Sequence, residues 1–195
     1  MTNSNINTDI PSTYRQLYRL ENLDDWKVHH DDVDIREYNV KTADGKTIGE
    51  VENLLVDVQD KKVRYIEVEL NDDVPEVNPQ AIGTYTERDG DRIIIVPVGL
   101  AEINKDDKSV DISGLFHTDF RTYPRYKSKA ALTPHYEKSV HSHLIGAPGT
   151  KKVLDEGAEA AGTGVDFDRS VYDGPLFRDS KYRRSAMRTT MTGIV

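Results

Sequence analysis

The sequence predicts a mainly β domain: a small antiparallel β-barrel, followed by a C-terminal amphipathic helix and flanked by extended polar N- and C-terminal arms. Three observations lead to this fold class. Short apolar stretches alternate with turn signals between residues 35 and 112, a spacing typical of small antiparallel barrels. A single helical stripe of apolar residues follows at 134–145. Residues 1–18 are rich in Asn, Ser and Thr, and residues 157–164 are rich in Gly and Ala, as in linkers.

The first predicted hairpin joins strands at 35–41 and 48–56. Alternating polar and apolar side chains in the first strand indicate one buried face. Asp44-Gly45 between the strands is a strong tight-turn signal, because glycine tolerates a positive φ. Gly49 in the return strand predicts a β-bulge or a close approach of another backbone.

Four further strands are expected after the polar turn 57–62, and the first two are 63–70 and 92–98. In the strand 63–70, the apolar side chains should face inward, and Glu67 and Glu69 should face outward. The strand 92–98 is almost wholly apolar, so both of its faces should be buried. Pro97 should lie at an edge or a bulge, because proline has no N–H for the ladder.

The loops and the last hairpin complete the predicted barrel. Residues 71–83 are acidic, contain two prolines and are expected to form a loop. Residues 100–103 and 109–112 should pair across a polar turn.

The helix 134–145 is expected to pack on the barrel. Thr133 is a typical N-cap and precedes a proline at the first helical position. Tyr136, Val140 and Leu144 recur at intervals of four residues and form one apolar stripe. Gly146 should end the helix.

These elements divide the 195 residues into a flexible arm at 1–18, a barrel domain with its helix at 19–146, and a Gly/Ala-rich linker with a basic tail at 147–195. Residues 171–177 carry enough apolar surface to dock, so the tail is either a tethered binding peptide or disordered. The chain has no cysteine, no recognisable signal sequence and no apolar stretch long enough to span a bilayer. We therefore expect a cytoplasmic protein.

Charge is distributed unevenly along the chain. The net charge is −8, which argues against nucleic acid as a main partner. The residues from Arg178 onward carry +4, so residues 1–177 carry −12. A basic tail on an acidic body suggests self-association or docking on an acidic partner, and a solvated tail without a partner is the alternative.

Several stretches resemble the PRC-barrel family in both sequence and order. They are DIREYNV at 34–40, DGKTIGEVENLLVD at 44–57, RYIEVEL at 64–70 and VPVGLA at 96–101. The motif YPRYKS at 123–128 and the following helix resemble the cytoplasmic domain of the photosynthetic reaction-centre H subunit. The resemblance covers roughly residues 19–146. Unlike that subunit, this sequence has no transmembrane helix.

The resemblance implies two kinds of role. In the photosynthetic family the domain caps the reaction centre and assists proton uptake, and the matching positions are Asp57, Asp60, Arg64 and Glu67. Neighbouring charges of this kind can spread the pKa values of the acids. An ordinary ion-pair network that fixes the hairpin is the alternative interpretation of the same four residues. Other PRC-barrel proteins act as adaptors in ribosome maturation or stand alone, and the shared property is docking onto macromolecules.

Aromatic and arginine residues are the candidate interface anchors, because these types are favoured at protein interfaces. They are Trp26, Tyr123, Arg125, Tyr126, Tyr172, Phe177, Tyr182 and Arg183.

No metal site is predicted. His29 and His30 are adjacent, and adjacent side chains diverge on regular structure. Glu137 and His141 can share a helix face at i, i+4, but two ligands do not make a site, so a surface pair is expected.

The sequence contains none of the common catalytic motifs, and no catalytic residue or cofactor is predicted. We expect a non-enzymatic interaction or scaffolding module that binds protein partners and self-associates through its arms into a homo-oligomer. The alternatives are a peripheral accessory of an electron-transfer complex that assists proton transfer and, more weakly, an RNA-processing adaptor.

Overall fold

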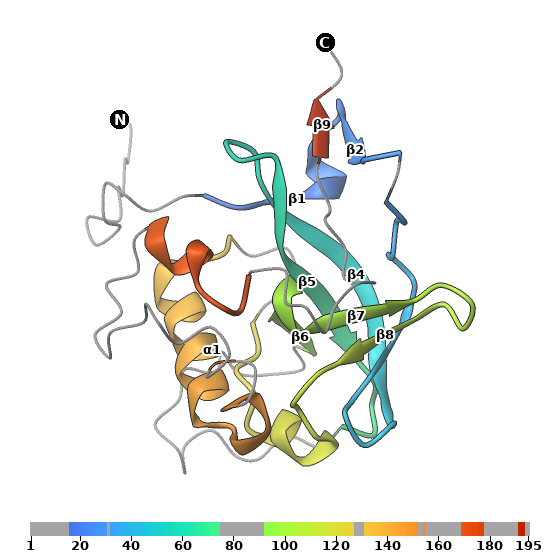
Figure 1. Ribbon diagram of the computed structural model, residues 1–195, viewed down its shortest axis with the longest axis vertical. Helices are drawn as coiled ribbons and strands as arrows, with labels where there is room; N and C mark the ends of the chain where they lie inside the picture. The colour runs from blue at the N-terminus through green and yellow to red at the C-terminus, as the bar shows by residue number, and fades with distance from the viewer. Residues whose placement is uncertain are drawn as a thin grey trace, which may run out of the picture.

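The computed structural model describes residues 16–30, 32–74, 92–126, 131–151, 154, 169–177 and 191–193. Figure 1 shows a curved sheet with the long helix on one side of it. Its strands are β1 (Tyr18–Arg19), β2 (Trp26–Val28), β3 (Asn39–Lys41), β4 (Thr47–Asp57), β5 (Lys62–Leu70), β6 (Ile93–Pro97), β7 (Ala101–Asn104), β8 (Ser109–Ile112) and β9 (Met191–Gly193). The helices are α1 (Pro134–Gly146) and the 3₁₀ turns η1 (Leu20–Asn22), η3 (Val98–Leu100), η4 (His117–Arg121), η5 (Pro148–Thr150) and η6 (Arg169–Asp173).

The main sheet confirms the predicted mainly β class. Its strand order is β6-β5-β4-β3-β8-β7, and β1 pairs with the far end of β4. All hairpins are antiparallel as expected, but β3 and β8 run parallel. Hairpin geometry requires antiparallel pairing only within a hairpin, and β3 and β8 belong to different ones. Among the described strands, β6 and β7 are the two ends of the path, so the hydrogen-bonded sheet does not close into a full barrel.

The first hairpin agrees with the sequence in its turn but not in the length of its first strand. Gly45 adopts φ 75°, as the Asp-Gly turn requires. A Cβ at Gly49 would lie 1.9 Å from the carbonyl oxygen of Glu69, which confirms the close approach. The expected strand 35–41 is shortened to Asn39–Lys41, because Glu37 takes a left-handed conformation with φ 70° that breaks the extended chain.

Strands β5 and β6 are buried more deeply than strands of a sheet that is covered on one face only. All five residues of β6 are buried, and Pro97 ends this edge strand, as predicted. The outward orientation expected for Glu67 is wrong: only 1% of this residue is exposed, whereas Glu69 is exposed. Helix α1, the segment 117–126 and the N-terminal strand cover surfaces that an isolated hairpin would leave in water (Figure 1).

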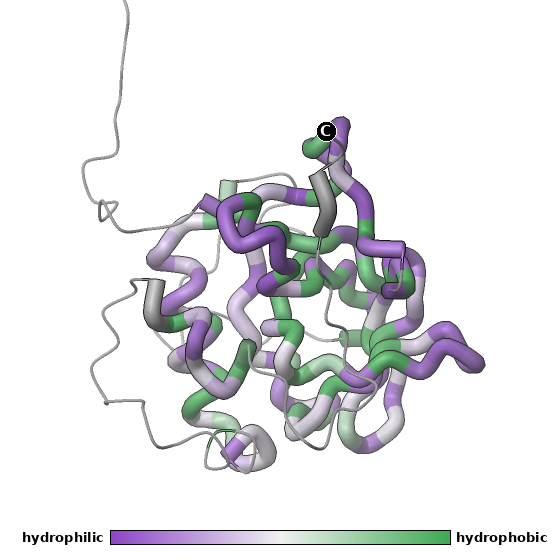
Figure 2. Tube along the Cα trace, turned by 45° about the horizontal axis from the view of Figure 1, so that its top comes forward, coloured by the Kyte–Doolittle hydropathy of each residue, from purple (hydrophilic) through white to green (hydrophobic). Residues whose placement is uncertain are grey.

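Helix α1 forms as predicted. The Thr133 side-chain oxygen accepts the N–H of Tyr136, which satisfies one of the free donors at the helix start. The stripe Tyr136, Val140 and Leu144 is buried and belongs to the main core. Figure 2 shows hydrophobic stretches concentrated in the middle of the sheet and polar residues at the tip of the β7–β8 hairpin.

The described parts of both terminal regions lie against the domain. The N-terminal strand β1 adds to β4, and β2 pairs with β9 from the end of the chain. Residues 169–177 lie beside the first half of α1, between the helix and the sheet (Figure 1). No helix in these described ranges is both long and apolar enough to cross a membrane.

Candidate functional site

Three of the four proton-pathway candidates form one compact group, which we call the turn cluster: Asp57, Asp60 and Arg64. One nitrogen of Arg64, Nη2, lies 3.3 Å from Asp57 Oδ2 and 2.6 Å from Asp60 Oδ2. The other oxygen of Asp57 accepts the backbone N–H groups of Gln59 and Asp60, at 3.0 and 3.1 Å. The turn cluster therefore closes the β4–β5 hairpin.

A β-bulge brings Arg64 into this cluster. Tyr65 pairs with Leu55 and Val63 pairs with Val56, so Arg64 is an extra residue without an opposite partner in the ladder. A bulge redirects the side chain that it carries. The alternation of polar and apolar residues in this strand does not predict the bulge, so the sequence does not indicate where the side chain of Arg64 points.

The fourth candidate, Glu67, belongs to a different group, which we call the bridge cluster: Arg19, Glu67 and Tyr126. Arg19 Nε donates to Glu67 Oε2 at 2.8 Å, and Arg19 Nη2 donates to Glu67 Oε1 at 2.7 Å. The same Nη2 donates to the Tyr126 hydroxyl at 3.0 Å, and that hydroxyl donates to Glu67. These contacts join β1, β5 and the segment before α1.

Electrostatics in the bridge cluster shift the pKa values of Arg19 and Tyr126 upward. Burial works against the charge of Arg19, but its hydrogen bond to Glu67 and the negative charge there outweigh this and raise the pKa of Arg19. Burial, together with the charge of Glu67, raises the pKa of the Tyr126 hydroxyl. Arg19 therefore stays charged and Tyr126 stays neutral across the physiological pH range.

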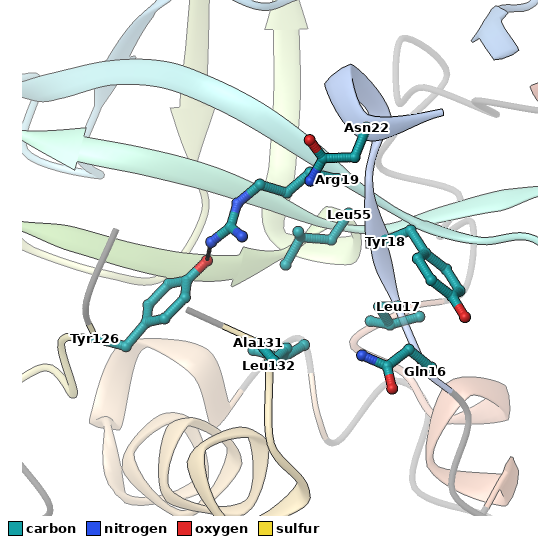
Figure 3. A pocket seen from close by; sticks show the side chains of 9 residues that line it. All are labelled: Gln16, Leu17, Tyr18, Arg19, Asn22, Leu55, Tyr126, Ala131 and Leu132. Carbon is teal, nitrogen blue, oxygen red and sulfur yellow. Dashed lines mark hydrogen bonds between the residues drawn. The ribbon is translucent and has the colours of Figure 1, made fainter. Parts of the chain in front are cut away.

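A small pocket of about 220 Å³ opens beside the bridge cluster. Figure 3 shows Arg19 and Tyr126 reaching toward each other at its inner side. The pocket is lined by Gln16, Leu17, Tyr18, Arg19, Asn22, Leu55, Tyr126, Ala131 and Leu132. Its volume is below the roughly 300–1,000 Å³ of ordinary ligand sites, and its charged wall is already neutralised by Glu67. We assign no ligand to it.

A more specific site lies where residues 169–177, here called the C-terminal segment, fill a groove between α1 and the strands. We call this the segment groove. Tyr172 is 5% exposed, and its ring centroid lies 4.8 Å from the guanidinium carbon of Arg64 in a cation–π contact. Its hydroxyl donates to Glu137 Oε1 at 2.8 Å. One aromatic side chain thus connects the turn cluster with helix α1.

The second anchor of the segment is Phe177. Its ring stacks on His141 with centroids 5.7 Å apart, and it meets Tyr65 edge-on at 5.2 Å. His141 Nε2 lies 3.0 Å from the Tyr65 hydroxyl. Burial lowers the pKa of His141 to about 4, so its imidazole is neutral at neutral pH.

Gly99 forms the floor of the groove. A Cβ at this position would lie 1.8 Å from the carbonyl oxygen of Leu176 and 2.9 Å from the N atom of Phe177. Only glycine therefore allows the backbone of the segment to lie this close to η3. The groove accepts a peptide backbone as well as two aromatic side chains.

The surface pair expected for Glu137 and His141 is wrong, because the two residues are 0% and 5% exposed. Their positions directly follow Tyr136 and Val140 in the apolar stripe, which widens the buried face of α1. The polar character of both residues obscured this signal.

Other interface candidates also lie inside the domain. Tyr123 is 2% exposed and donates to the Ile95 carbonyl at 2.8 Å, and Arg125 donates to the Val74 carbonyl at 3.1 Å. Tyr126 belongs to the bridge cluster. Trp26 is half-buried in β2, and Tyr182 and Arg183 lie outside the described residues.

The structure groups no set of metal ligands within its described part. The rings of His29 and His30 lie close together at a tilt of 36°, with centroids 4.2 Å apart.

The part of the chain that forms strands β3 to β8 matches one family. The PRC-barrel domain model matches residues 28–115. This chain contains a PRC-barrel domain. The matched region ends before α1. Helix α1, which forms one side of the segment groove, and the C-terminal segment therefore lie outside the matched region. No curated protein matches the chain.

Proposed function

We propose that this protein is a non-enzymatic interaction module in which a PRC-barrel domain binds peptide segments and self-associates through its terminal regions. The observation that carries this proposal is the segment groove, which holds residues 169–177 by two aromatic anchors. Aromatic anchors in desolvated pockets supply much of the affinity at protein interfaces. The PRC-barrel domain supports a role in protein interaction.

The contacts of the charged residues in the two clusters support the same proposal. In the turn cluster the carboxylates bind Arg64 and backbone N–H groups, and in the bridge cluster Glu67 binds Arg19 and Tyr126. These groups hold segments of the chain together. A catalytic acid or base would need access to a substrate.

Sedimentation velocity of the full chain at increasing concentration tests self-association. We expect a concentration-dependent shift from monomer to dimer or a higher oligomer, weakened by salt because the basic tail and the acidic body attract each other. A single monomeric species up to about 1 mM would contradict self-association, because a dimer that is weaker than this has a binding free energy of less than about 4 kcal/mol.

A second candidate function is proton transfer in an electron-transfer complex. One observation favours it: the side chain of Asp60 is 27% exposed while those of Arg64 and Asp57 are 6% and 1% exposed, so an ion-pair chain leads from solvent inward. Asp60→Asn should then slow quinone-linked proton uptake in membranes from the native cells. Unchanged uptake would leave the turn cluster with a purely structural role.

A further inference from the structure

We propose that the C-terminal segment of one copy docks into the segment groove of a second copy, so that the module self-associates by exchanging residues 169–177. This inference rests on the proposed function and names the surface and the partner. The occupant is identified by the groove itself, which already contains this segment in the same chain. A segment that fits the groove of its own chain also fits the groove of a second copy, provided that the connection to the segment is long enough.

The first step of the argument is the specificity of the groove. Tyr172 is held by its ring over Arg64 and by its hydroxyl on Glu137, two contacts that few side chains could make together. Phe177 fills the space between His141 and Tyr65. A matching peptide therefore needs a tyrosine and, five residues later, a phenylalanine.

The second step is the shape of the segment. Gly174 donates its N–H to Val171 at 3.1 Å, and Phe177 donates to Gly174 at 3.0 Å. These turns use contacts within the segment alone, and the rings of the two anchors, Tyr172 and Phe177, meet edge-on with centroids 5.1 Å apart. The segment can therefore carry its bound shape from one groove to another.

The third step is the connection. Residues 155–168 join the end of the helical region to the segment, and their Gly/Ala-rich composition is that of a linker. Fully extended, these 14 residues could span about 45–50 Å. That reach is sufficient for a neighbouring copy. Charge adds attraction, because the residues following the segment carry +4 and the rest of the chain carries −12.

Cis and trans docking compete for the same groove. A linker of this length gives the cis segment an effective concentration of about millimolar, so cis docking prevails in dilute solution. The experiment therefore removes both cis pairs and leaves one trans pair.

Two full-length chains with complementary defects provide this test. The first carries Tyr172→Ala and Phe177→Ala, which removes the anchors and leaves the groove intact. The second carries Gly99→Ala, which blocks the groove and leaves the segment intact, since the new Cβ would overlap the Leu176 carbonyl. We expect the mixture to form a 1:1 heterodimer in native mass spectrometry and sedimentation at about 100 µM of each chain.

The matched control mixes the first chain with a Gly99→Ala chain that also carries Tyr172→Ala and Phe177→Ala, and it should form no heterodimer. Absence of a heterodimer in the test mixture, or its equal formation in the control, would overturn the proposal. The proposed function fails separately. If the wild type forms an oligomer but the mixture forms no heterodimer, self-association uses another surface. If the mixture forms a heterodimer but the wild type is monomeric, the groove binds the segment in trans and the wild type does not self-associate.

Limited proteolysis gives a second measurement on single variants. Chymotrypsin cleavage after Tyr172, followed by mass spectrometry, should be about tenfold faster in Gly99→Ala than in the wild type, because cleavage follows the population of undocked segment. Gly146→Ala is the matched control, since a Cβ there meets nothing within 4 Å, and its cleavage rate should equal that of the wild type. If Gly99→Ala and Gly146→Ala were cleaved at equal rates, the absence of a side chain at Gly99 would not be needed for docking of the segment.

Discussion

The turn cluster and the bridge cluster both have an ion pair on strand β5, but they do different work. In the turn cluster the partners of Arg64 are four and seven residues away, within one hairpin. In the bridge cluster the partners of Glu67 are 48 and 59 residues away. A local pair fixes a turn that the hairpin already favours, whereas a distant pair fixes the position of whole segments. The distant pair should therefore matter more to stability.

The largest expected effect is that of Glu67→Ala. It leaves Arg19 buried without its carboxylate, and breaking a buried pair from one side costs about 3–5 kcal/mol. Urea unfolding monitored by circular dichroism measures the free energy of unfolding. Glu69→Ala on the same strand is the control, because its side chain is 51% exposed and should cost about 0.5 kcal/mol or less. Similar losses in the two variants would remove the distinction between the clusters.

The groove beside the turn cluster should also respond to pH in a way that the bridge cluster does not. The pKa of His141 is about 4 in the folded protein and about 6.5 in the unfolded chain, so the unfolded chain binds more protons between these values. Stability from this group is therefore complete above pH 6.5 and declines by about 3 kcal/mol as the pH falls to 4.

His141→Gln should flatten this decline, because glutamine does not titrate and its amide can still hydrogen-bond to Tyr65. Denaturation at pH 7 and at pH 4.5 provides the measurement. Some decline should remain, since burial also lowers the pKa of His143. Ser142→Ala, an exposed neighbour on the same helix, should keep the full decline. An unchanged decline in His141→Gln would show that the titration of His141 does not couple to folding.

The smallest effects are expected within the turn cluster itself. Asp57→Ala removes two backbone caps and one partner of Arg64, and should cost about 2 kcal/mol because Asp60 still binds the guanidinium. Asp60→Ala removes a partly exposed partner and should cost less than about 1 kcal/mol. Chemical denaturation of the two variants under identical conditions compares them. A greater loss for Asp60→Ala would mean that the exposed ion pair, and not the buried cap, holds the turn.

Local patterns in the sequence were sufficient for most elements of the fold. The Asp-Gly turn, the apolar strand β6 and the capped helix α1 each depend on neighbours within a few residues. The PRC-barrel resemblance is confirmed by the family match at residues 28–115.

The candidate site depended on contacts between distant parts of the chain. The sequence placed Glu67 with Asp57, Asp60 and Arg64 in one group, because they are close along the chain. The structure separates them, since a bulge redirects Arg64 and the N-terminal strand brings Arg19 to Glu67. No local pattern encodes which distant segment will cover a given face.

Sequence alone thus determined most strands of the main sheet, helix α1, the mainly β class and the presence of aromatic residues near the C-terminal end. Tertiary structure decided that Tyr172 and Phe177 lie against Arg64 and His141, and that Glu137 is buried. The physical reason is that turns, caps and apolar periodicity arise from interactions between neighbouring residues. Burial of a polar side chain is set by whichever distant surfaces pack over it, and these are defined only when the whole chain has folded.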